Sequence, residues 1–144
     1  IQQYANQCFK RGCYVEPEHP QPGDKLDRLL IYQIPHYTCE YRFTDYDYAQ
    51  NKLKATDYRC AYVANMPRDY TPDKCFRDFN YADRPCANSM PSLSVSDLIV
   101  MERSDKAEAL YVDAVGFNDV SRLLPELHDM EVERQEHNLD ELER

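Results

Sequence analysis

The sequence predicts an α+β fold: a small antiparallel β body stapled by disulfides, with short helices, followed by a C-terminal hairpin and an acidic helix. Six cysteines fall within the first 90 residues of the 144-residue chain, which is typical of a disulfide framework. Two segments of that region alternate aromatic and polar residues, as half-buried strands do. Farther along, two segments rich in Val, Leu and Ile flank a charged run, which is the pattern of a hairpin.

The 144 residues suit one main domain, because a chain of this length can bury most of its unfolded surface. We expect a disulfide-stapled α+β domain over residues 1–116, with the six cysteines inside 1–90 and a Cys-free hairpin over 93–116. Residues 117–144 are expected to form an acidic segment that is helical or partly disordered, because its apolar residues are sparse.

The disulfide expectation depends on the cysteine count. The cysteines are Cys8, Cys13, Cys39, Cys60, Cys75 and Cys86. An even number favours about three disulfides and an oxidising compartment. The sequence opens on Ile1 rather than Met, which fits removal of a signal peptide, although a trimmed expression product would look the same. We therefore expect a secreted, extracellular protein; the alternative is an intracellular protein with six reduced thiols.

Two segments, 37–41 and 58–62, share the pattern Tyr-x-Cys-x-Tyr. Because side chains alternate across a strand, each segment is expected to place two tyrosines and a cysteine on one face. The polar stretch 44–57 between them is too long for a tight turn and is expected to be an exposed loop. The tyrosines predicted to contact a ligand or partner are Tyr37, Tyr41, Tyr46, Tyr48, Tyr58 and Tyr62.

Two short helices are expected, one before and one after these strands. Asp24 can cap the first helix at its N-terminus. The shared apolar face of this helix would consist of Leu26, Leu29 and Leu30. The second helix begins at 71–73, because Pro is tolerated at the first helical position and Asp favours the helix N-terminus. Its buried stripe would consist of Cys75, Phe76 and Phe79.

The amino-acid composition changes after Pro91, where segments rich in Val, Leu and Ile begin. Residues 93–101 and 109–116 read as two strands joined as a hairpin across the charged run between them. From residue 118 or 119 onward the composition favours a helix, with Pro125 near its first turn. The few apolar contacts of this helix would be Leu127, Leu139 and Leu142.

The net negative charge comes from the C-terminal part of the chain. Residues 1–90 hold 12 basic and 12 acidic side chains, whereas residues 91–144 hold 5 and 14, so the formal charge of −9 belongs to the latter. A nucleic-acid partner is disfavoured, because phosphate binding needs concentrated Lys and Arg. The sequence has no apolar run long enough to cross a bilayer.

The sequence contains no recognisable catalytic, cofactor or metal motif. Asp45 and Asp47 are spaced like the first ligands of a helix-loop-helix calcium site, but Gln50 replaces the required Gly and Thr56 the bidentate Glu. The four histidines lack metal-ligand spacing. With three glycines in the chain, neither a phosphate-binding loop nor a nucleophile elbow is present. We therefore predict no catalytic residue, no cofactor and no metal ligand.

The function that these features favour is that of a secreted, non-enzymatic binding protein for a protein partner or a small apolar ligand. The alternative is an acidic, Tyr-rich extracellular structural or matrix component, although such proteins are usually of lower complexity. A small secreted hydrolase is the third hypothesis, because a catalytic triad built from distant residues is invisible in a sequence. The partner's identity, the disulfide pairing and the oligomeric state are left open.

Overall fold

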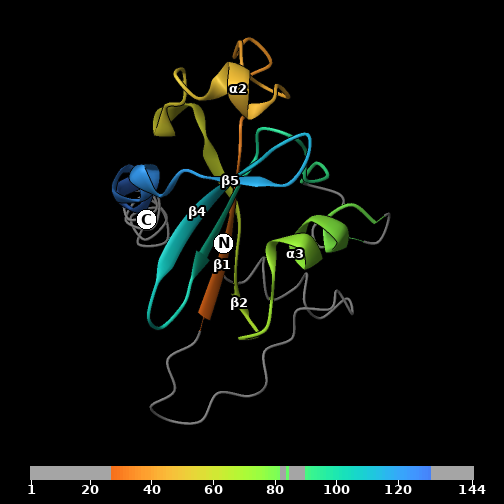
Figure 1. The fold of residues 1–144 in the computed structure, drawn as a ribbon, viewed down its shortest axis with the longest axis vertical. Helices are drawn as coiled ribbons and strands as arrows, with labels where there is room; N and C mark the ends of the chain where they lie inside the picture. Colours follow the sequence, from red (N-terminus) through yellow and green to blue (C-terminus); the bar gives the residue numbers. More distant parts are fainter. Residues whose placement is uncertain (1–26, 82–83, 85–89, 131–144) are drawn as a thin grey trace, which may run out of the picture.

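The structure is a computed structural model that describes residues 27–81, 84 and 90–130. Five antiparallel strands form a sheet in the order β2-β1-β3-β4-β5 (Figure 1). The strands are β1 (Asp27–Gln33), β2 (Arg59–Met66), β3 (Leu98–Glu102), β4 (Ala107–Val112) and β5 (Phe117–Asp119). The prediction of a mixed fold with an antiparallel sheet and few short helices is confirmed.

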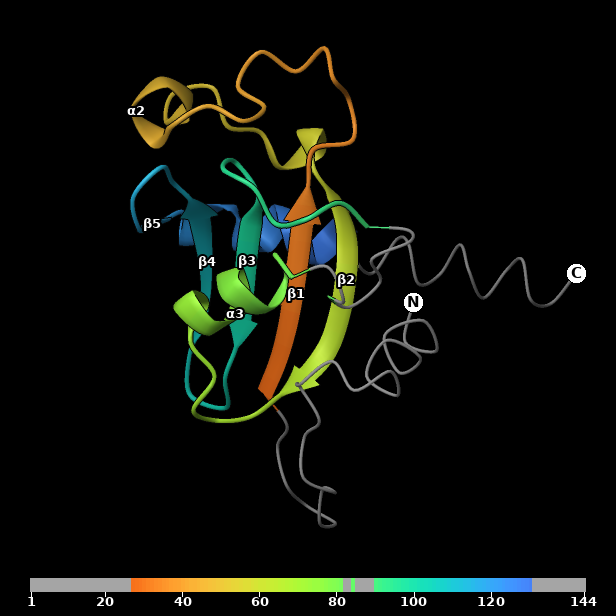
Figure 2. The ribbon, with the colours of Figure 1, turned by 90° about the vertical axis from the view of Figure 1, so that its right-hand side faces the viewer.

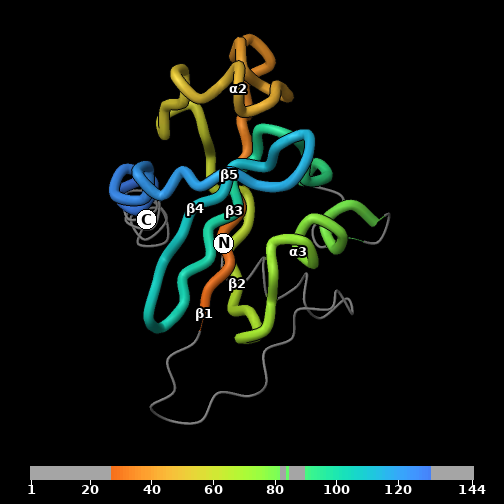
Figure 3. The backbone as a smooth tube through the Cα atoms, viewed as in Figure 1, coloured from red at the N-terminus to blue at the C-terminus, as the bar shows by residue number. Residues whose placement is uncertain are grey.

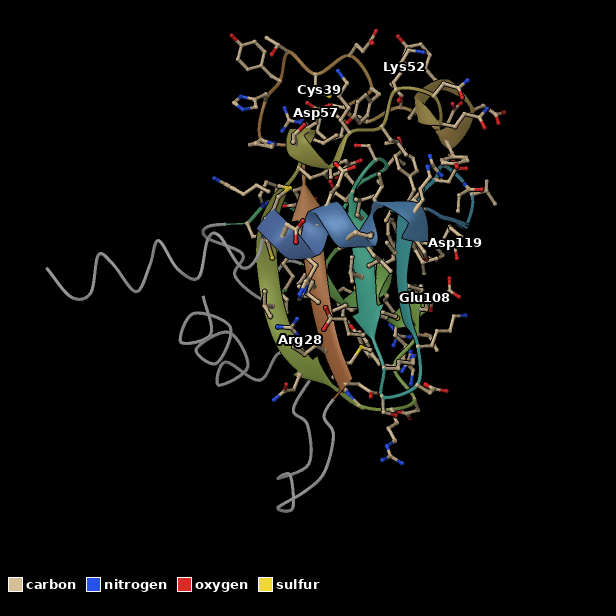
Figure 4. The ribbon with its side chains drawn as sticks, turned by 90° about the vertical axis from the view of Figure 1, so that its left-hand side faces the viewer. Arg28, Cys39, Lys52, Asp57, Glu108 and Asp119 are labelled. Atoms are coloured by element: carbon tan, nitrogen blue, oxygen red, sulfur yellow. The ribbon has the colours of Figure 1, made fainter. Side chains whose placement is uncertain are left out.

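Short helices lie on both faces of the sheet and beyond one of its ends. They are α2 (Tyr46–Ala49), η1 (Ala55–Asp57), α3 (Pro72–Asp78) and η2 (Ser121–Leu123), the last continued by a helix over 124–130. Figure 2 shows α3 against one face of the sheet, and Figure 4 shows helix 124–130 across the opposite face. The segment from β1 to β2, which carries α2 and η1, extends beyond the end of the sheet (Figure 3).

The central strands β1 and β3 each contain a run of four buried, largely apolar residues, 29–32 and 98–101, because both faces of the sheet are covered. In β1, Leu29 and Ile31 pack on the face under α3, which we call the α3 face. Leu30 and Tyr32 alternate with them and pack on the opposite face, under helix 124–130, which we call the C-terminal face. Burial on two sides removes the polar alternation that marks a half-exposed strand, so the two-sided cover explains the unbroken apolar run.

The predicted helix after Asp24 is wrong for the residues that the structure describes. Leu29 and Leu30 belong to strand β1 and point to opposite faces rather than sharing one. Asp24 and Leu26 lie outside the described residues. The run Leu29 to Tyr32 is buried at every position, which a one-sided helix cannot achieve but a central strand can.

The two Tyr-x-Cys-x-Tyr segments differ in structure. Segment 37–41 is not a strand: it forms successive turns, in which the Cys39 N–H bonds to the His36 carbonyl and the Arg42 N–H to the Cys39 carbonyl. Segment 58–62 runs into β2, but a β-bulge leaves Ala61 without a register partner in β1.

The bulge separates side chains that a regular strand would place together. Tyr62 packs on the α3 face, with its ring centroid 4.9 Å from that of Phe79, whereas Cys60 packs on the C-terminal face. The prediction of two tyrosines and one cysteine on a common face is therefore wrong, because one inserted residue reverses the alternation.

The loop expected over 44–57 contains α2 and η1, and its two alanines are fully buried. Ala49 and Ala55 pack on the C-terminal face, so this segment is in part a cover for the core. Its polar side chains still face solvent in most positions, as expected from the composition.

Helix α3 begins as predicted. The Thr71 side chain accepts a hydrogen bond from the Lys74 N–H at 3.2 Å, and Pro72 follows it. Cys75 and Phe79 are fully buried on the α3 face. Phe76, expected in the same stripe, is 39% exposed, because a residue one position after Cys75 is rotated away from the i, i+4 face.

The structure does not support the disulfide framework. Cys39 and Cys75 are free thiols, and the Cys60 thiol lies 3.7 Å from the Tyr62 carbonyl oxygen as a weak donor. No disulfide is present among these three cysteines, and Cys60 and Cys75 lie on opposite faces of the sheet. Cys8, Cys13 and Cys86 lie outside the described residues. The part of the fold described here is held by apolar burial on two faces rather than by disulfides.

The C-terminal hairpin is confirmed, with shorter strands than predicted. The Arg103 N–H bonds to the Lys106 carbonyl at 2.8 Å and closes the turn between β3 and β4. The predicted boundary between the α+β domain (residues 1–116) and the acidic C-terminal segment (residues 117–144) falls between β4 and β5 of one sheet. Leu127 is 1% exposed, and its carbonyl accepts a hydrogen bond from the Tyr32 hydroxyl at 3.3 Å. Residues 117–130 therefore belong to the same core, whereas Leu139 and Leu142 lie outside the described residues.

Candidate functional site

A pocket of about 450 Å³ opens at the end of the sheet where β1 finishes and where β2 and β3 begin. Figure 2 shows the segment before β3 crossing the ends of β1 and β2 at this place. We call this hollow the Asp97 pocket. Its walls are Gln33, Ile34, Pro35, Arg42, Phe43, Arg59, Pro91, Ser92, Ser94 and Asp97.

Asp97 is the buried acid of the pocket, with 4% of its surface exposed. Its Oδ2 accepts hydrogen bonds from Gln33 Nε2 at 3.1 Å and from the Ser94 N–H at 2.9 Å. The Gln33 amide also donates to the Pro91 carbonyl at 3.2 Å, which ties β1 to the segment before β3. Among the described residues no donor bonds the other oxygen, Oδ1, so this atom is available to a ligand.

Burial raises the pKa of Asp97 to about 7, because a low-dielectric surrounding disfavours the charged carboxylate. The hydrogen bonds from Ser94 and Gln33, and the positive charge of Arg42, act in the opposite direction and only partly offset the effect of burial. Asp97 therefore changes its charge near neutral pH. A carboxyl group with such a pKa inside a pocket is a recognised sign of a functional site.

A partly buried turn over 94–97 holds Asp97 in place. Ser96 is fully buried and has a φ of 85°, a left-handed conformation that costs energy for a residue other than glycine. Its hydroxyl accepts a hydrogen bond from the Phe43 N–H at 2.9 Å, and its carbonyl accepts one from the Tyr58 hydroxyl at 2.6 Å. These contacts stabilise the strained turn and fix the direction of the Asp97 side chain.

Arg42 and Arg59 supply positive charge to the pocket wall. Arg42 stacks on Phe43, with its guanidinium carbon 4.5 Å from the ring centre. Arg59 is exposed at the start of β2, opposite Gln33 in the β1–β2 register. Neither arginine forms an ion pair with a carboxylate of the described residues. By contrast, Arg28 pairs with Glu102 at 2.8 Å, toward the other end of β1 (Figure 4).

The tyrosines predicted to contact a ligand do not form one surface. Tyr41, Tyr58 and Tyr62 are buried core residues, with at most 3% of their surface exposed. Tyr58 supports the Asp97 pocket indirectly, through its hydrogen bond to Ser96. Tyr37 and Tyr48 are exposed, at 85% and 45%.

Tyr46 completes the predicted set and is a half-buried structural residue. Its ring packs against Tyr111 with the centroids 5.4 Å apart, and its backbone N–H bonds to Asp113 at 3.1 Å. Nearby, Asp45 caps α2 by accepting a hydrogen bond from the Tyr48 N–H at 3.0 Å. The acidic pair that resembled a calcium loop therefore starts a helix, and no cluster of three possible metal ligands occurs in the described ranges.

A second hollow of about 270 Å³ lies on the C-terminal face beside helix 124–130. Its walls are mostly apolar, and include Tyr32, Val100, Leu124 and Leu127. The acid at its rim, Glu102, is already paired with Arg28. Because this hollow lacks an unpaired buried polar group, it makes a weaker candidate than the Asp97 pocket.

The residues of the Asp97 pocket were not singled out from the sequence. They come from three separate stretches, around residues 33–43, at 59 and at 91–97, which the sheet brings together. The one local signal was the polar run of residues 94–97 directly before an apolar strand, which marks a turn but not a site.

Comparison with known proteins places this architecture in a family. Residues 28–122 match the model of the YodL-like domain, which is about two thirds of the chain. The chain belongs to the YodL-like domain family. The matched part of this YodL-like domain runs from β1 into η2 and includes every residue of the Asp97 pocket. No curated protein and no solved structure matches the chain.

Within the described residues, none of the helices is both long and apolar enough to span a membrane.

Proposed function

We propose that this YodL-like domain is a non-enzymatic binding protein that takes a small polar ligand into the Asp97 pocket. One observation carries the proposal: a carboxyl group with 4% exposure keeps an unbonded oxygen in a pocket whose wall holds two arginines without carboxylate partners among the described residues. Burial of a carboxylate is costly, and a ligand that bonds to its open oxygen recovers part of that cost.

The lining of the pocket favours a polar ligand over the apolar one expected from the tyrosines. Six of its ten wall residues are polar or charged, and the tyrosines of 58–62 are packed in the core. The volume of about 450 Å³ is within the range of small-molecule sites. A site with several convergent polar groups selects its ligand by hydrogen bonds.

Binding is better supported than hydrolysis. The Ser94 hydroxyl donates to the Ser92 carbonyl at 3.2 Å, and Ser94 contacts Asp97 through its backbone N–H. An activated serine would need its hydroxyl bonded to a general base.

The hypothesis of a structural or matrix component has weaker support, because both sheet faces carry a packed core typical of a discrete globular domain. An extracellular location stays a prediction, and the free thiols Cys39 and Cys75 do not add to its support.

The proposal can be tested by NMR with ¹⁵N-labelled protein and a library of small carboxylates, phosphates, amines, amides and zwitterions. We expect amide shifts that cluster on residues 33–34, 42–43, 59 and 92–97. The β3–β4 turn at 103–106 lies at the opposite end of the sheet and serves as an internal control. Absence of saturable shifts, or shifts confined to the hollow beside helix 124–130, would refute the assignment of the Asp97 pocket.

A further inference from the structure

We propose that the ligand of the Asp97 pocket is a small zwitterion of the amino-acid type, whose ammonium group binds Asp97 and whose carboxylate binds Arg42 and Arg59. This inference rests on the proposed function, because it names the ligand class of the same pocket. It follows from the presence of both charge signs within one hollow, where no ion pair joins Asp97, Arg42 or Arg59 to an oppositely charged side chain of the described residues.

The first step concerns Asp97. Its Oδ2 already accepts two hydrogen bonds, from Gln33 and Ser94, whereas Oδ1 accepts none from the described residues. An ammonium group would give Oδ1 a charge-assisted hydrogen bond, which is shorter and stronger than one from a neutral donor. A cation also compensates the cost of holding a carboxylate in a buried place.

The second step concerns the two arginines. A guanidinium group binds a carboxylate through two parallel hydrogen bonds, so an arginine on the pocket wall suits this group. The Phe43 ring beneath Arg42 restricts its guanidinium plane, which reduces the entropy lost on binding.

The third step compares ligand charges. A simple anion would be attracted by Arg42 and Arg59 but repelled by Asp97. A simple cation would be attracted by Asp97 but repelled by the two arginines. A zwitterion satisfies both signs at once. The apolar part of the wall, formed by Ile34, Pro35, Phe43 and Pro91, can pack against the rest of the ligand.

The pH dependence of binding follows from the groups around Asp97. The phenols of Tyr58 and Tyr111 interact electrostatically with Asp97, and both have raised pKa values, so they stay neutral near pH 7. Asp97 itself must be ionised to bind an ammonium group, so affinity should rise as the pH increases through about 7.

The experiment screens the twenty proteinogenic amino acids singly by thermal shift and measures the strongest by calorimetry. For each amino acid that binds, the probes also include its primary amide, which lacks the carboxylate, and its N-acetyl derivative, which lacks the ammonium group. We expect each derivative to bind at least about tenfold more weakly, the loss of one charge-assisted contact. Equal binding of either derivative would overturn the inference.

A second outcome separates this inference from the proposed function. If simple carboxylates or phosphates shift the pocket amides while no amino acid binds, the zwitterion is refuted and the pocket remains a binding site. If no probe of any class binds there, both proposals fail.

Variants test the assigned contacts. Asp97→Asn and Arg59→Gln should each weaken binding at least about tenfold. Asp69→Asn and Arg68→Gln change exposed residues of the 66–70 turn, at the other end of β2, and should bind like the unmodified protein. Circular dichroism establishes that each variant is folded. Unchanged affinity in folded Asp97→Asn or Arg59→Gln would refute the assigned contacts.

The pH series gives a readout that a purely structural role would not produce. From pH 5.5 to 8, affinity for the amino acid should rise in the unmodified protein and become flat in Asp97→Asn. His36→Gln is the matched control, because His36 is exposed directly beside Pro35 of the pocket wall. Loss of the pH dependence in His36→Gln, or affinity that falls with rising pH, would contradict the inference.

Discussion

Replacing Asp97 with Asn should make the protein more stable at neutral and alkaline pH. In the folded state the pKa of Asp97 is raised to about 7, mainly by burial, from the ordinary value of 3.8. The folded state therefore holds its proton more tightly than the unfolded state does. The free energy of unfolding contributed by this group is highest below pH 3.8, falls as the pH rises toward 7, and is constant above that.

The size of the effect follows from the two pKa values. The difference between about 7 and 3.8, at about 1.4 kcal/mol per pH unit, corresponds to about 4 kcal/mol. Asn keeps an oxygen for the hydrogen bonds from Gln33 and Ser94 but carries no charge. At pH 8 we expect Asp97→Asn to be more stable than the unmodified protein by up to about 4 kcal/mol, and near pH 4 the two should be nearly equal.

Urea unfolding monitored by fluorescence at half-unit steps from pH 4 to pH 8 measures this difference directly. The other carboxyl groups contribute equally to both proteins and cancel in the comparison. Asp69→Asn is the matched control, because Asp69 is exposed and should show no such pH-dependent gain. A gain that is independent of pH, or a variant that is less stable at pH 8, would refute the physical account of the pocket.

Three further predictions concern the core. Leu127→Ala should lower the free energy of unfolding by about 2–5 kcal/mol, because Leu127 is 1% exposed on the C-terminal face, while Glu126→Ala should be nearly neutral. Urea midpoints check this, and equal effects would mean that helix 124–130 is not part of the core. Tyr58→Phe should cost about 1–3 kcal/mol by removing a buried donor, whereas Tyr37→Phe should have no effect; a neutral Tyr58→Phe in thermal unfolding would contradict the bond. Cys75 should resist a thiol reagent in the native protein, because it is fully buried and its pKa is raised, and react after unfolding without reductant; mass spectrometry of the labelled peptide decides the outcome.

The elements that local patterns specify were predictable. Thr71 and Pro72 mark the start of α3 through capping chemistry alone, and the charged run between the apolar segments marks the hairpin of β3 and β4. Strand β1 was mistaken for a helix, because its Leu residues fit helical spacing and the two-sided cover that removes its alternation comes from distant elements.

The candidate site could not be predicted, because its parts meet only in the folded sheet. Asp97 and Gln33 are 64 positions apart, and the pairing of β1 with β3 brings them within hydrogen-bond distance. For the cysteines, folding instead keeps apart residues that the sequence suggested would meet. The even count suggested disulfide pairing, but Cys60 and Cys75 lie on opposite faces of the sheet. The Ala61 bulge was likewise invisible, since nothing in the local composition marks it.

The position of β1 at the centre of the sheet has a consequence for synthesis of the chain. This strand is made well before its later neighbours: the β3 partner of Arg28 lies at Glu102, and Leu127, which covers the C-terminal face, comes later still. At ribosomal rates of about 5–20 residues per second, the apolar side chains of β1 wait roughly 5–20 seconds for this cover. Until β3 is made, β2 is the one described strand that can pair with β1, and α3, which follows β2 directly, can cover the α3 face. A two-stranded ribbon with its C-terminal face open to solvent is therefore the form of this domain that a chaperone would encounter.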